Sequence, residues 1–238
     1  MKKLGLIGGT GPESTIEYYR EIVYGVQKKT GEAFFPNLTI ESLSVFDVLR
    51  FCDHQDYRGL TEYLLRGIQC LSDSGAEYAA LTGITPHVVF EELSADSPIP
   101  LVSMVETSCS YAAENGFRKV GLLGTGPTMR GTFFQKAFAD RGIETVTPCD
   151  EDLQFIAARI ETELEFGKIV PETQKEFCRI VNRMADEDGI QAVVLGCTEL
   201  PMIFRGTELP VPGIDVMRVH IDALIDLITD GTPVGVQA

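Results

Sequence analysis

Long apolar runs are absent from this 238-residue sequence, and without a stretch of about 18 apolar residues no membrane-spanning helix is expected. The short apolar run near the N-terminus is broken at once by Gly8, Gly9 and Pro12, so it lacks the form of a signal peptide. No two cysteines have the CxxC spacing of a zinc or redox site. The six scattered cysteines are therefore expected to be reduced thiols in a cytoplasmic protein that holds no metal.

Positive charge is scarce. Lys and Arg total 20 and Asp and Glu total 35, which gives a formal net charge of −15. A balance this acidic repels nucleic acids and anionic membranes, so neither is expected as a partner. It does not exclude an anionic small molecule, because a binding site can carry its own local field. Hydrophobic residues make up 44% of the chain, which is ordinary for a globular protein with a full core.

Short apolar runs alternate with longer amphipathic stretches along the whole chain. This alternation predicts an α/β fold with parallel sheets and helices on both faces. Strands are predicted at 4–7, 38–45, 78–81, 101–105, 120–123, 144–146, 192–195 and 211–214. Helices are predicted at 14–28 with Ser14 as the cap, at 57–72, 85–93 and 128–141, and within 151–166 and 172–187.

The sequence resembles itself at an offset near 115 residues. The segment Lys3–Pro12 matches Lys119–Pro127, with one extra glycine in the first copy, and Gly75–Leu81 matches Gly189–Leu195. Two matches in the same order at nearly the same spacing predict two similar lobes related by a pseudo-two-fold axis, each a parallel sheet flanked by helices. We assign residues 1–104 and 211–238 to the first lobe and 105–210 to the second, and expect the active site at the lobe interface.

The repeat also pairs positions at which a strand ends and a helix begins. Gly83 corresponds to Cys197, Ile84 to Thr198, and Thr85 to Glu199. Ligands of open α/β sheets bind beyond the carboxyl ends of the strands, so these loops are expected to face a cleft.

Two glycine-rich turns connect a strand to a helix. Thr10 lies in the first turn, and Thr125 and Thr128 lie in or directly after the second. Neither turn has the GxGxxG or P-loop pattern of a nucleotide site. Backbone N–H groups at a helix N-terminus can hold a carboxylate, so two such turns favour a dicarboxylic substrate. The alternative is that both are simply tight turns.

Cys197 is the candidate reactive thiol. A free cysteine is usually a small buried hydrophobe, which is our interpretation of the other five. Cys197 instead lies at a strand end, beside polar Thr198 and Glu199 and before an expected helix. A helix N-terminus there is expected to lower the thiol pKa below its usual value of about 8.5. A thiolate can remove a proton from carbon, and the thiol can return one.

Four other residues have both a structural and a functional interpretation. His87 and His220 are interpreted as structural histidines, with an Asp215–His220 pair as the alternative for the second. Arg130 and Lys168 are ordinarily solvated cations, but either could neutralise a side-chain carboxylate of a substrate.

These motifs resemble those of the aspartate/glutamate racemase family. The segments Gly8–Thr15, Thr85–Leu93 and Gly196–Pro201 carry the resemblance, which covers nearly the whole chain. It implies a racemase without cofactor, metal or pyridoxal phosphate, in which two facing acid/base residues, usually cysteines, flank the α-carbon of an amino acid. It also implies a homodimer. We take the following as substrate-binding candidates: Thr10, Ser44, Ile84, Thr85, Thr125, Thr128, Lys168, Thr198 and Glu199.

The sequence departs from the family pattern at the first active-site position. Gly83 stands where the family usually has a cysteine, and Ile84 where it usually has an asparagine. Glycine cannot carry a proton, so Thr82, Thr85 or water would have to serve the second face of the substrate. Two alternatives remain open. One is a lyase or isomerase of the same superfamily that needs a single thiol, as the resemblance to arylmalonate decarboxylase implies. The other is a catalytically silent protein that binds dicarboxylates or amino acids.

Overall fold

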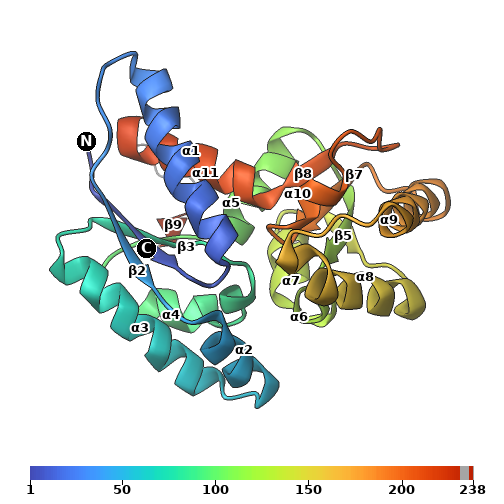
Figure 1. Cartoon of the computed structure of the whole chain (residues 1–238), viewed down its shortest axis with the longest axis horizontal. Coiled ribbons are helices and arrows are strands. Elements are labelled where there is room, and N and C mark those ends of the chain that lie inside the picture. The colour runs from blue at the N-terminus through green and yellow to red at the C-terminus, as the bar shows by residue number, and fades with distance from the viewer. Residues whose placement is uncertain (231–235, 238) are drawn as a thin grey trace. The chain divides into compact units, whose positions relative to one another are not determined.

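The chain divides into two compact units. The computed structural model describes residues 1–230 and 236–237. Unit 1 comprises Met1–Thr107 and the described part of Met217–Ala238, and unit 2 comprises Ser108–Val216. The blue N-terminal elements of Figure 1 therefore share unit 1 with the red C-terminal helix α11.

Unit 1 is built on a five-stranded sheet of order β2-β1-β3-β4-β9, in which β9 is antiparallel to β4 and the other pairs are parallel. The strands are β1 (Leu4–Gly8), β2 (Leu38–Ser42), β3 (Tyr78–Leu81), β4 (Leu101–Val102) and β9 (Val236–Gln237). The helices are α1 (Pro12–Thr30), α2 (Val45–Asp53), α3 (Tyr57–Asp73), η1 (Thr85–Val89), α4 (Phe90–Asp96) and α11 (Val216–Asp230), with α5 (Met104–Glu114) continuing into unit 2.

Unit 2 is built on a four-stranded parallel sheet of order β6-β5-β7-β8. The strands are β5 (Lys119–Gly124), β6 (Glu144–Val146), β7 (Ala192–Gly196) and β8 (Gly213–Asp215). The helices are α6 (Gly126–Arg130), α7 (Phe133–Ala139), α8 (Asp150–Thr162), η2 (Leu164–Phe166), α9 (Pro171–Arg183), η3 (Met184–Asp188) and α10 (Leu200–Ile203).

The two sheets repeat one topology, as the sequence repeat predicts. Each places its second strand in the chain at the edge, followed by the first, third and fourth. The register repeats too, because Leu4 pairs with Tyr78 in unit 1 and Val120 pairs with Ala192 in unit 2. These are the residues that the sequence match sets equivalent. The predicted α/β fold with two similar lobes is confirmed.

The core of unit 1 lies on both faces of its sheet. On one face, Leu60, Leu64 and Ile68 of α3 are fully buried in a cluster with Ile7 and Leu81 of the sheet. Helices α1 and α11 pack together, and Figure 1 shows them side by side. Gly25 of α1 allows that approach, because a Cβ atom there would overlap the side chain of Ile225.

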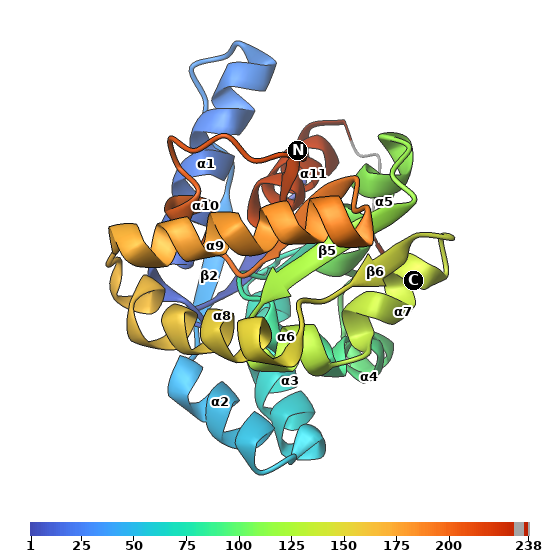
Figure 2. The same ribbon diagram turned by 90° about the vertical axis from the view of Figure 1, so that its right-hand side faces the viewer.

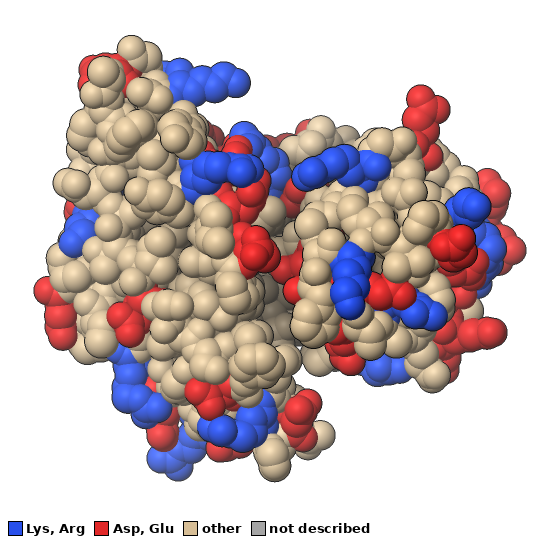
Figure 3. All heavy atoms as spheres, in the orientation of Figure 1, with Lys and Arg blue, Asp and Glu red and all other residues tan. Residues whose placement is uncertain are grey.

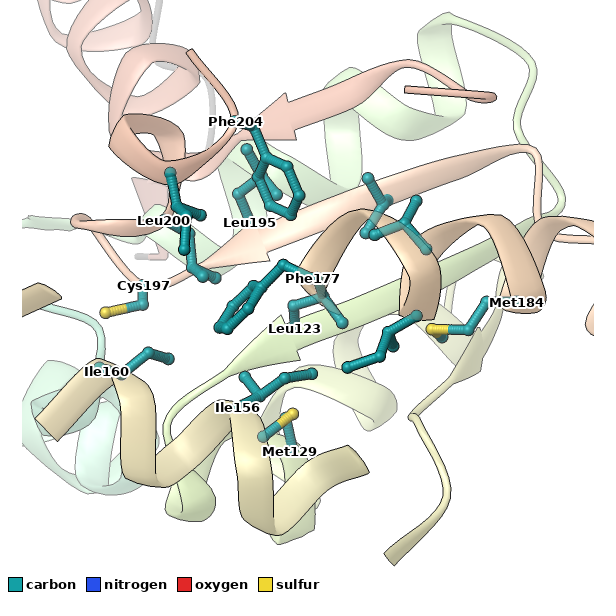
Figure 4. Packing of buried hydrophobic residues seen from close by; sticks show 14 of the residues in the cluster. Leu123, Met129, Ile156, Ile160, Phe177, Met184, Leu195, Cys197, Leu200 and Phe204 are labelled. Atoms are coloured by element: carbon teal, nitrogen blue, oxygen red, sulfur yellow. The ribbon is translucent and has the colours of Figure 1, made fainter. Parts of the chain in front are cut away.

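Helices α8 and α9 cover one face of the sheet in unit 2 (Figure 2). Ile156 and Ile160 of α8 and Phe177 of α9 pack against Leu123 and Leu195 of the sheet (Figure 4). Each of the three helical side chains is fully buried, which is worth about 1.5–3 kcal/mol per side chain by the hydrophobic effect. This core supports the end of β7, where the candidate cysteine follows.

Several predicted boundaries are wrong. The strand predicted at 38–45 ends at Ser42, and the one predicted at 101–105 ends at Val102, because α2 and α5 begin there instead. The helix predicted at 128–141 is divided into α6 and α7 by Gly131, whose extended backbone (φ −71°, ψ 164°) cannot continue a helix. Ser14 is not the cap of α1, since the cap position is Gly11.

Among the described residues no helix has the length and apolar character needed to cross a membrane. Acidic and basic side chains lie interspersed on the face shown in Figure 3. Several ion pairs of the chain lie within one helix, such as Arg58–Glu62 at 3.0 Å. Exposed pairs of this kind contribute little to stability.

Candidate active site

The strand ends of unit 1 bring most of its candidate residues together. Ile7 pairs with Leu81, so the turn after β1 lies beside the segment after β3. The hydroxyl of Thr82 donates to the carbonyl oxygen of Ile7 at 3.1 Å, and the hydroxyl of Ser14 contacts the carbonyl oxygen of Thr82 at 3.2 Å. Because Thr82 is fully buried and already bonded, its hydroxyl serves the structure of this loop.

Three further candidates of unit 1 follow the ends of β2 and β3. Ile84 is only 5% exposed, so its apolar side chain is buried. Thr85 begins η1 and is partly exposed. Ser44 follows the end of β2, where its backbone N–H donates to the hydroxyl of Tyr63 at 3.1 Å.

His87 positions the backbone of Gly83. Its Nε2 atom accepts the N–H of Met104 at 3.1 Å, so Nδ1 carries the hydrogen and donates to the carbonyl oxygen of Gly83, also at 3.1 Å. The ring stacks on Phe90 at a centroid distance of 5.0 Å. Burial lowers the pKa of His87 to about 4, so the ring is neutral near pH 7.

His220 is the second buried histidine of unit 1. Its two nitrogens contact the hydroxyl of Tyr18 at 2.7 Å and the carbonyl oxygen of Val102 at 3.2 Å. Burial, with a smaller contribution from His87, lowers the pKa of His220 to about 3. Both ring nitrogens of His220 are therefore engaged with neighbouring residues of the fold. This is a structural role and not that of a general base.

The strand ends of unit 2 have the same arrangement. Gly124 pairs with Gly196, so Thr125 and Cys197 are the next residues on neighbouring strands. The fully buried side chain of Thr128 packs over both glycines, and a Cβ atom on either one would approach it within 3.2 Å. The hydroxyls of Thr125 and Thr128 lie 3.0 Å apart in a hydrogen bond.

Cys197 is hydrogen-bonded to a carboxylate. Its Sγ atom lies 2.9 Å from Oε2 of Glu199, and the hydroxyl of Thr198 donates to the same oxygen at 2.8 Å. The residue is only 5% exposed. In Figure 4 it lies at the margin of the core cluster, with the sulfur pointing away from the ring of Phe177.

The expectation of a lowered thiol pKa at Cys197 is wrong. Burial raises the pKa of Cys197 well above its usual value, and the negative charge and hydrogen bond of Glu199 raise it further. Helix α10 has four residues and supplies too small a dipole to offset these effects. The resting side chain is therefore a neutral thiol whose hydrogen points to Glu199.

Glu165 is a charged neighbour of this pair that sequence reasoning missed. Burial and the charges of Glu199 and Glu161 raise the pKa of Glu165, and Glu165 in turn adds to the raised pKa of Cys197. It belongs to η2, which packs against α10. The contact between these two short helices brings Glu165 near Cys197 and Glu199. The sequence itself gave no sign of this beyond the acidic residues within 161–165.

The segment that carries Glu165 and Lys168 is anchored by a buried carboxylate. Glu163 accepts hydrogen bonds from Arg159 and from the hydroxyl of Thr173, each at 2.7 Å. Lys168 is exposed, and its Nζ atom lies 5.7 Å from the ring centroid of Phe166. An exposed ammonium on an anchored segment is available to a carboxylate ligand.

Within the part of the chain that the structure describes, no group of three or more His, Cys, Asp or Glu side chains is arranged to hold a metal ion. Near Cys197 the donors are one thiol and the carboxylates of Glu199 and Glu165. This set is suited to proton transfer.

The sequence profile of one protein family, described as Asp/Glu/Hydantoin racemase, matches residues 7–224. The chain belongs to the Asp/Glu/Hydantoin racemase family. The broad-specificity amino-acid racemase of Bacillus subtilis (strain 168) is 23% identical over 216 residues, which cover 89% of this chain and 92% of that protein.

Solved structures agree with this family. The chain resembles an aspartate racemase homologue from Pyrococcus horikoshii OT3, with a TM-score of 0.83 and 33% identity over 96% of this chain and all of the other. It also resembles a proposed Asp/Glu racemase from Yersinia pestis, with a TM-score of 0.89 and 29% identity over 96% and 99% of the two chains. The predicted family and the enzyme class, an isomerase of the amino-acid racemase type, are confirmed.

Proposed function

We propose that this protein is an amino-acid racemase that uses Cys197 as an acid/base at the α-carbon, without a cofactor. The observation that carries the proposal is the hydrogen bond from the Cys197 thiol to Glu199 at the end of β7. A thiol whose proton is already directed to a carboxylate can exchange that proton within one site. The pair lies at the carboxyl end of a parallel strand, where α/β proteins bind their ligands.

The reaction begins with a proton transfer between side chains. The carboxylate of Glu199 accepts the thiol proton of Cys197, and the thiolate then removes the α-proton of the substrate. The electron pair left on the α-carbon is delocalised into the substrate carboxylate. Cys197 is then again a thiol. A water molecule gives a proton to the opposite face of the α-carbon, which yields the other enantiomer, and the hydroxide left behind takes the proton from Glu199 to restore the carboxylate. Thr198 holds the accepting oxygen of Glu199 in place.

The proposed substrate is an amino acid with a second carboxylate. The strand-to-helix turn that carries Thr125 lies beside Cys197 at the strand ends of unit 2, and its backbone N–H groups would bind one carboxylate. The exposed ammonium of Lys168 would neutralise the second carboxylate. One similar structure supports this class, since it is described as an aspartate racemase homologue.

Unit 1 offers no second thiol at the loop that corresponds to Cys197. Because Gly83 has no side chain and Thr82 is buried and bonded, neither can act as a second thiol. A single-thiol lyase or isomerase is therefore the second candidate function. The observation that favours it is that unit 2 carries a cysteine at the position where unit 1 carries a glycine.

Proton–deuterium exchange at the α-carbon in heavy water tests the proposal. Both enantiomers of aspartate, glutamate and a panel of other amino acids are incubated with the protein, and exchange and optical rotation are followed together. Exchange with racemisation supports the proposed function. Exchange with retention supports a single-thiol catalyst, and binding without exchange supports a silent amino-acid-binding protein.

A homodimer is also proposed, and sedimentation of the purified protein tests it. Ile16, Tyr19 and Tyr24 on α1 are each more than half exposed, and Phe35 packs against Tyr24 in the segment before the edge strand β2. Apolar side chains that are this exposed near an open sheet edge support association. Replacement of Tyr19 and Tyr24 by Ser should shift a dimer to the monomer.

A further inference from the structure

The segment that joins α8 to α9 in unit 2 is held by few apolar contacts. Leu164 is buried in the core, but Phe166 and Ile169 are 70% and 48% exposed, and Lys168 is exposed as well. A segment that buries little apolar surface is easily displaced unless polar contacts hold it. Its hydrogen bonds therefore decide where its charged side chains lie.

Glu163 makes most of these hydrogen bonds. Its buried carboxylate accepts one from Arg159 and one from the hydroxyl of Thr173, each at 2.7 Å. Its backbone carbonyl oxygen accepts the N–H of Phe166 at 3.1 Å and the N–H of Lys168 at 3.0 Å. One residue thus joins the end of α8, the following turn and the first turn of α9.

The first turn of α9 is also bonded to the helix that follows the cysteine. The Nε2 atom of Gln174, the residue after Thr173, donates to the carbonyl oxygen of Ile203 at 2.7 Å. Ile203 is the last residue of α10, which begins directly after Glu199. A single helical turn therefore holds the segment that carries Glu165 and the helix next to the reactive thiol.

Helices α8 and α9 have a separate connection at their other ends. The buried carboxylate of Asp152 in α8 pairs with Arg179 at 2.9 Å and with Arg183 at 2.5 Å, both from α9. Loss of the hydrogen bond between Glu163 and Thr173 should therefore release the segment while the two helices stay packed.

We propose that Glu163 and Thr173 are positioning residues, whose hydrogen bond fixes Glu165 and Lys168 relative to Cys197. The proposal rests on the proposed function, in which Lys168 neutralises the second carboxylate of the substrate. Glu163 and Thr173 act through these charged side chains and do not contact the substrate themselves. Their effect can still be large, since a displacement of about 1 Å at a reacting site can cost about 10²-fold in rate.

The first test is substrate selectivity in Thr173→Val, which removes the hydroxyl without a change of charge. The KM values for aspartate and glutamate should rise about tenfold or more, the worth of one hydrogen bond to a charged group. The KM of any substrate without a second carboxylate should not change, because it does not need Lys168. Thr173→Ser keeps the hydroxyl and should restore the wild-type values.

Asp152→Asn is the matched control. It weakens a buried carboxylate contact between the same two helices, so its melting temperature should fall, but its KM values should stay those of the wild type. Glu163→Gln is a second variant in case Thr173→Val does not fold. It loses the ion pair with Arg159 and should raise the same KM values.

The second test needs no catalysis. The charge of Glu165 raises the pKa of Cys197, and Glu165 and Glu199 repel one another. In Thr173→Val the released Glu165 should move away, and the pH profile of Cys197 alkylation should shift to lower pH. The shift should not exceed that in Glu165→Gln, and Asp152→Asn should show none.

The two tests separate this proposal from the proposed function. If the wild type exchanges no amino acid, the racemase proposal fails, and the alkylation profile alone decides about Thr173. A shift in Thr173→Val but not in Asp152→Asn then supports the positioning role. An unshifted profile, or the same shift in both variants, overturns it whether or not the wild type is active. In an active enzyme, wild-type KM values for aspartate and glutamate in Thr173→Val also overturn it.

Discussion

The Sγ atom of Cys197 lies 2.9 Å from Oε2 of Glu199, and the same oxygen accepts the hydroxyl of Thr198. Three consecutive residues thus form one hydrogen-bonded unit directly after β7. The arrangement keeps the thiol protonated at rest and gives its proton one defined acceptor. Four predictions follow from this hydrogen-bonded group of three residues and from the glycine and the buried histidines of unit 1.

Cys197→Ser should reduce α-proton exchange by at least about 10³-fold, because a serine hydroxyl is scarcely ionised near neutral pH and cannot replace the thiolate. Exchange is measured by NMR in heavy water on the folded variant. Cys70→Ser and Cys149→Ser are matched controls, since both cysteines are exposed and distant in sequence from the motif. Exchange in Cys197→Ser near the wild-type rate would remove Cys197 from the mechanism.

Glu199→Gln should lower the pKa of the Cys197 thiol, because it removes a negative charge that raises this pKa. The pH profile of alkylation by iodoacetamide, followed at Cys197 by mass spectrometry, should shift to lower pH. The pKa stays above its usual value, since burial is the larger cause. Exchange should nevertheless fall about 10²-fold or more, because an amide cannot accept the thiol proton.

Glu165→Gln is the control for the charge at Glu199. Glu165 raises the pKa of Cys197 only through its charge. In Glu165→Gln the pH profile of Cys197 alkylation should therefore shift to lower pH, by less than in Glu199→Gln. If Glu165→Gln reduces exchange as strongly as Glu199→Gln does, the proton acceptor has been wrongly assigned.

Gly83→Ala should destabilise the protein by roughly 1–3 kcal/mol, the usual cost of overpacking a site that cannot yield. The new Cβ atom would meet the carbonyl and hydroxyl oxygens of Thr10 at 2.8 Å. Gly213→Ala is the control, because the nearest atom to a Cβ there is 3.5 Å away. Urea unfolding measures both free energies, and equal stability of the two variants would contradict the predicted contact.

Two buried histidines should make the protein less stable in mild acid. The folded-state pKa values of His87 and His220 are about 4 and about 3, below the value of about 6.5 in the unfolded chain. Between about pH 6 and pH 4 the unfolded state therefore binds more protons, and stability falls as pH falls. Each histidine contributes a slope of roughly 1.4 kcal/mol per pH unit in this window.

This prediction is tested by the slope of the free energy of unfolding against pH, and not by the stability at one pH. His87→Phe loses the acceptor for the Met104 N–H and should be less stable at pH 7, but its free energy of unfolding should change less between pH 6 and pH 4. His54→Gln is the control, because His54 is exposed. An unchanged slope in His87→Phe would contradict the assignment of a buried neutral ring.

The sequence by itself determined the architecture. Its repeat set Leu4 equivalent to Val120 and Tyr78 to Ala192, and those residues pair in the same register in the two sheets. Each buried parallel strand of the repeat is a continuous apolar run followed by a turn with glycine. This pattern is local, so the repeat can be recognised from a single sequence. The Cys197-Thr198-Glu199 motif was visible for the same reason, since its three residues are consecutive.

Only the tertiary structure decided the chemistry of that motif and the place of Thr10. The raised pKa of Cys197 arises from burial under the unit 2 core and from the approach of Glu165, neither of which has a local sequence signal. The contact between Thr10 and Gly83 joins residues 73 positions apart, and it exists because β1 and β3 are neighbours. Local pattern specifies which elements form, whereas the distances between their ends depend on how the whole sheet is packed.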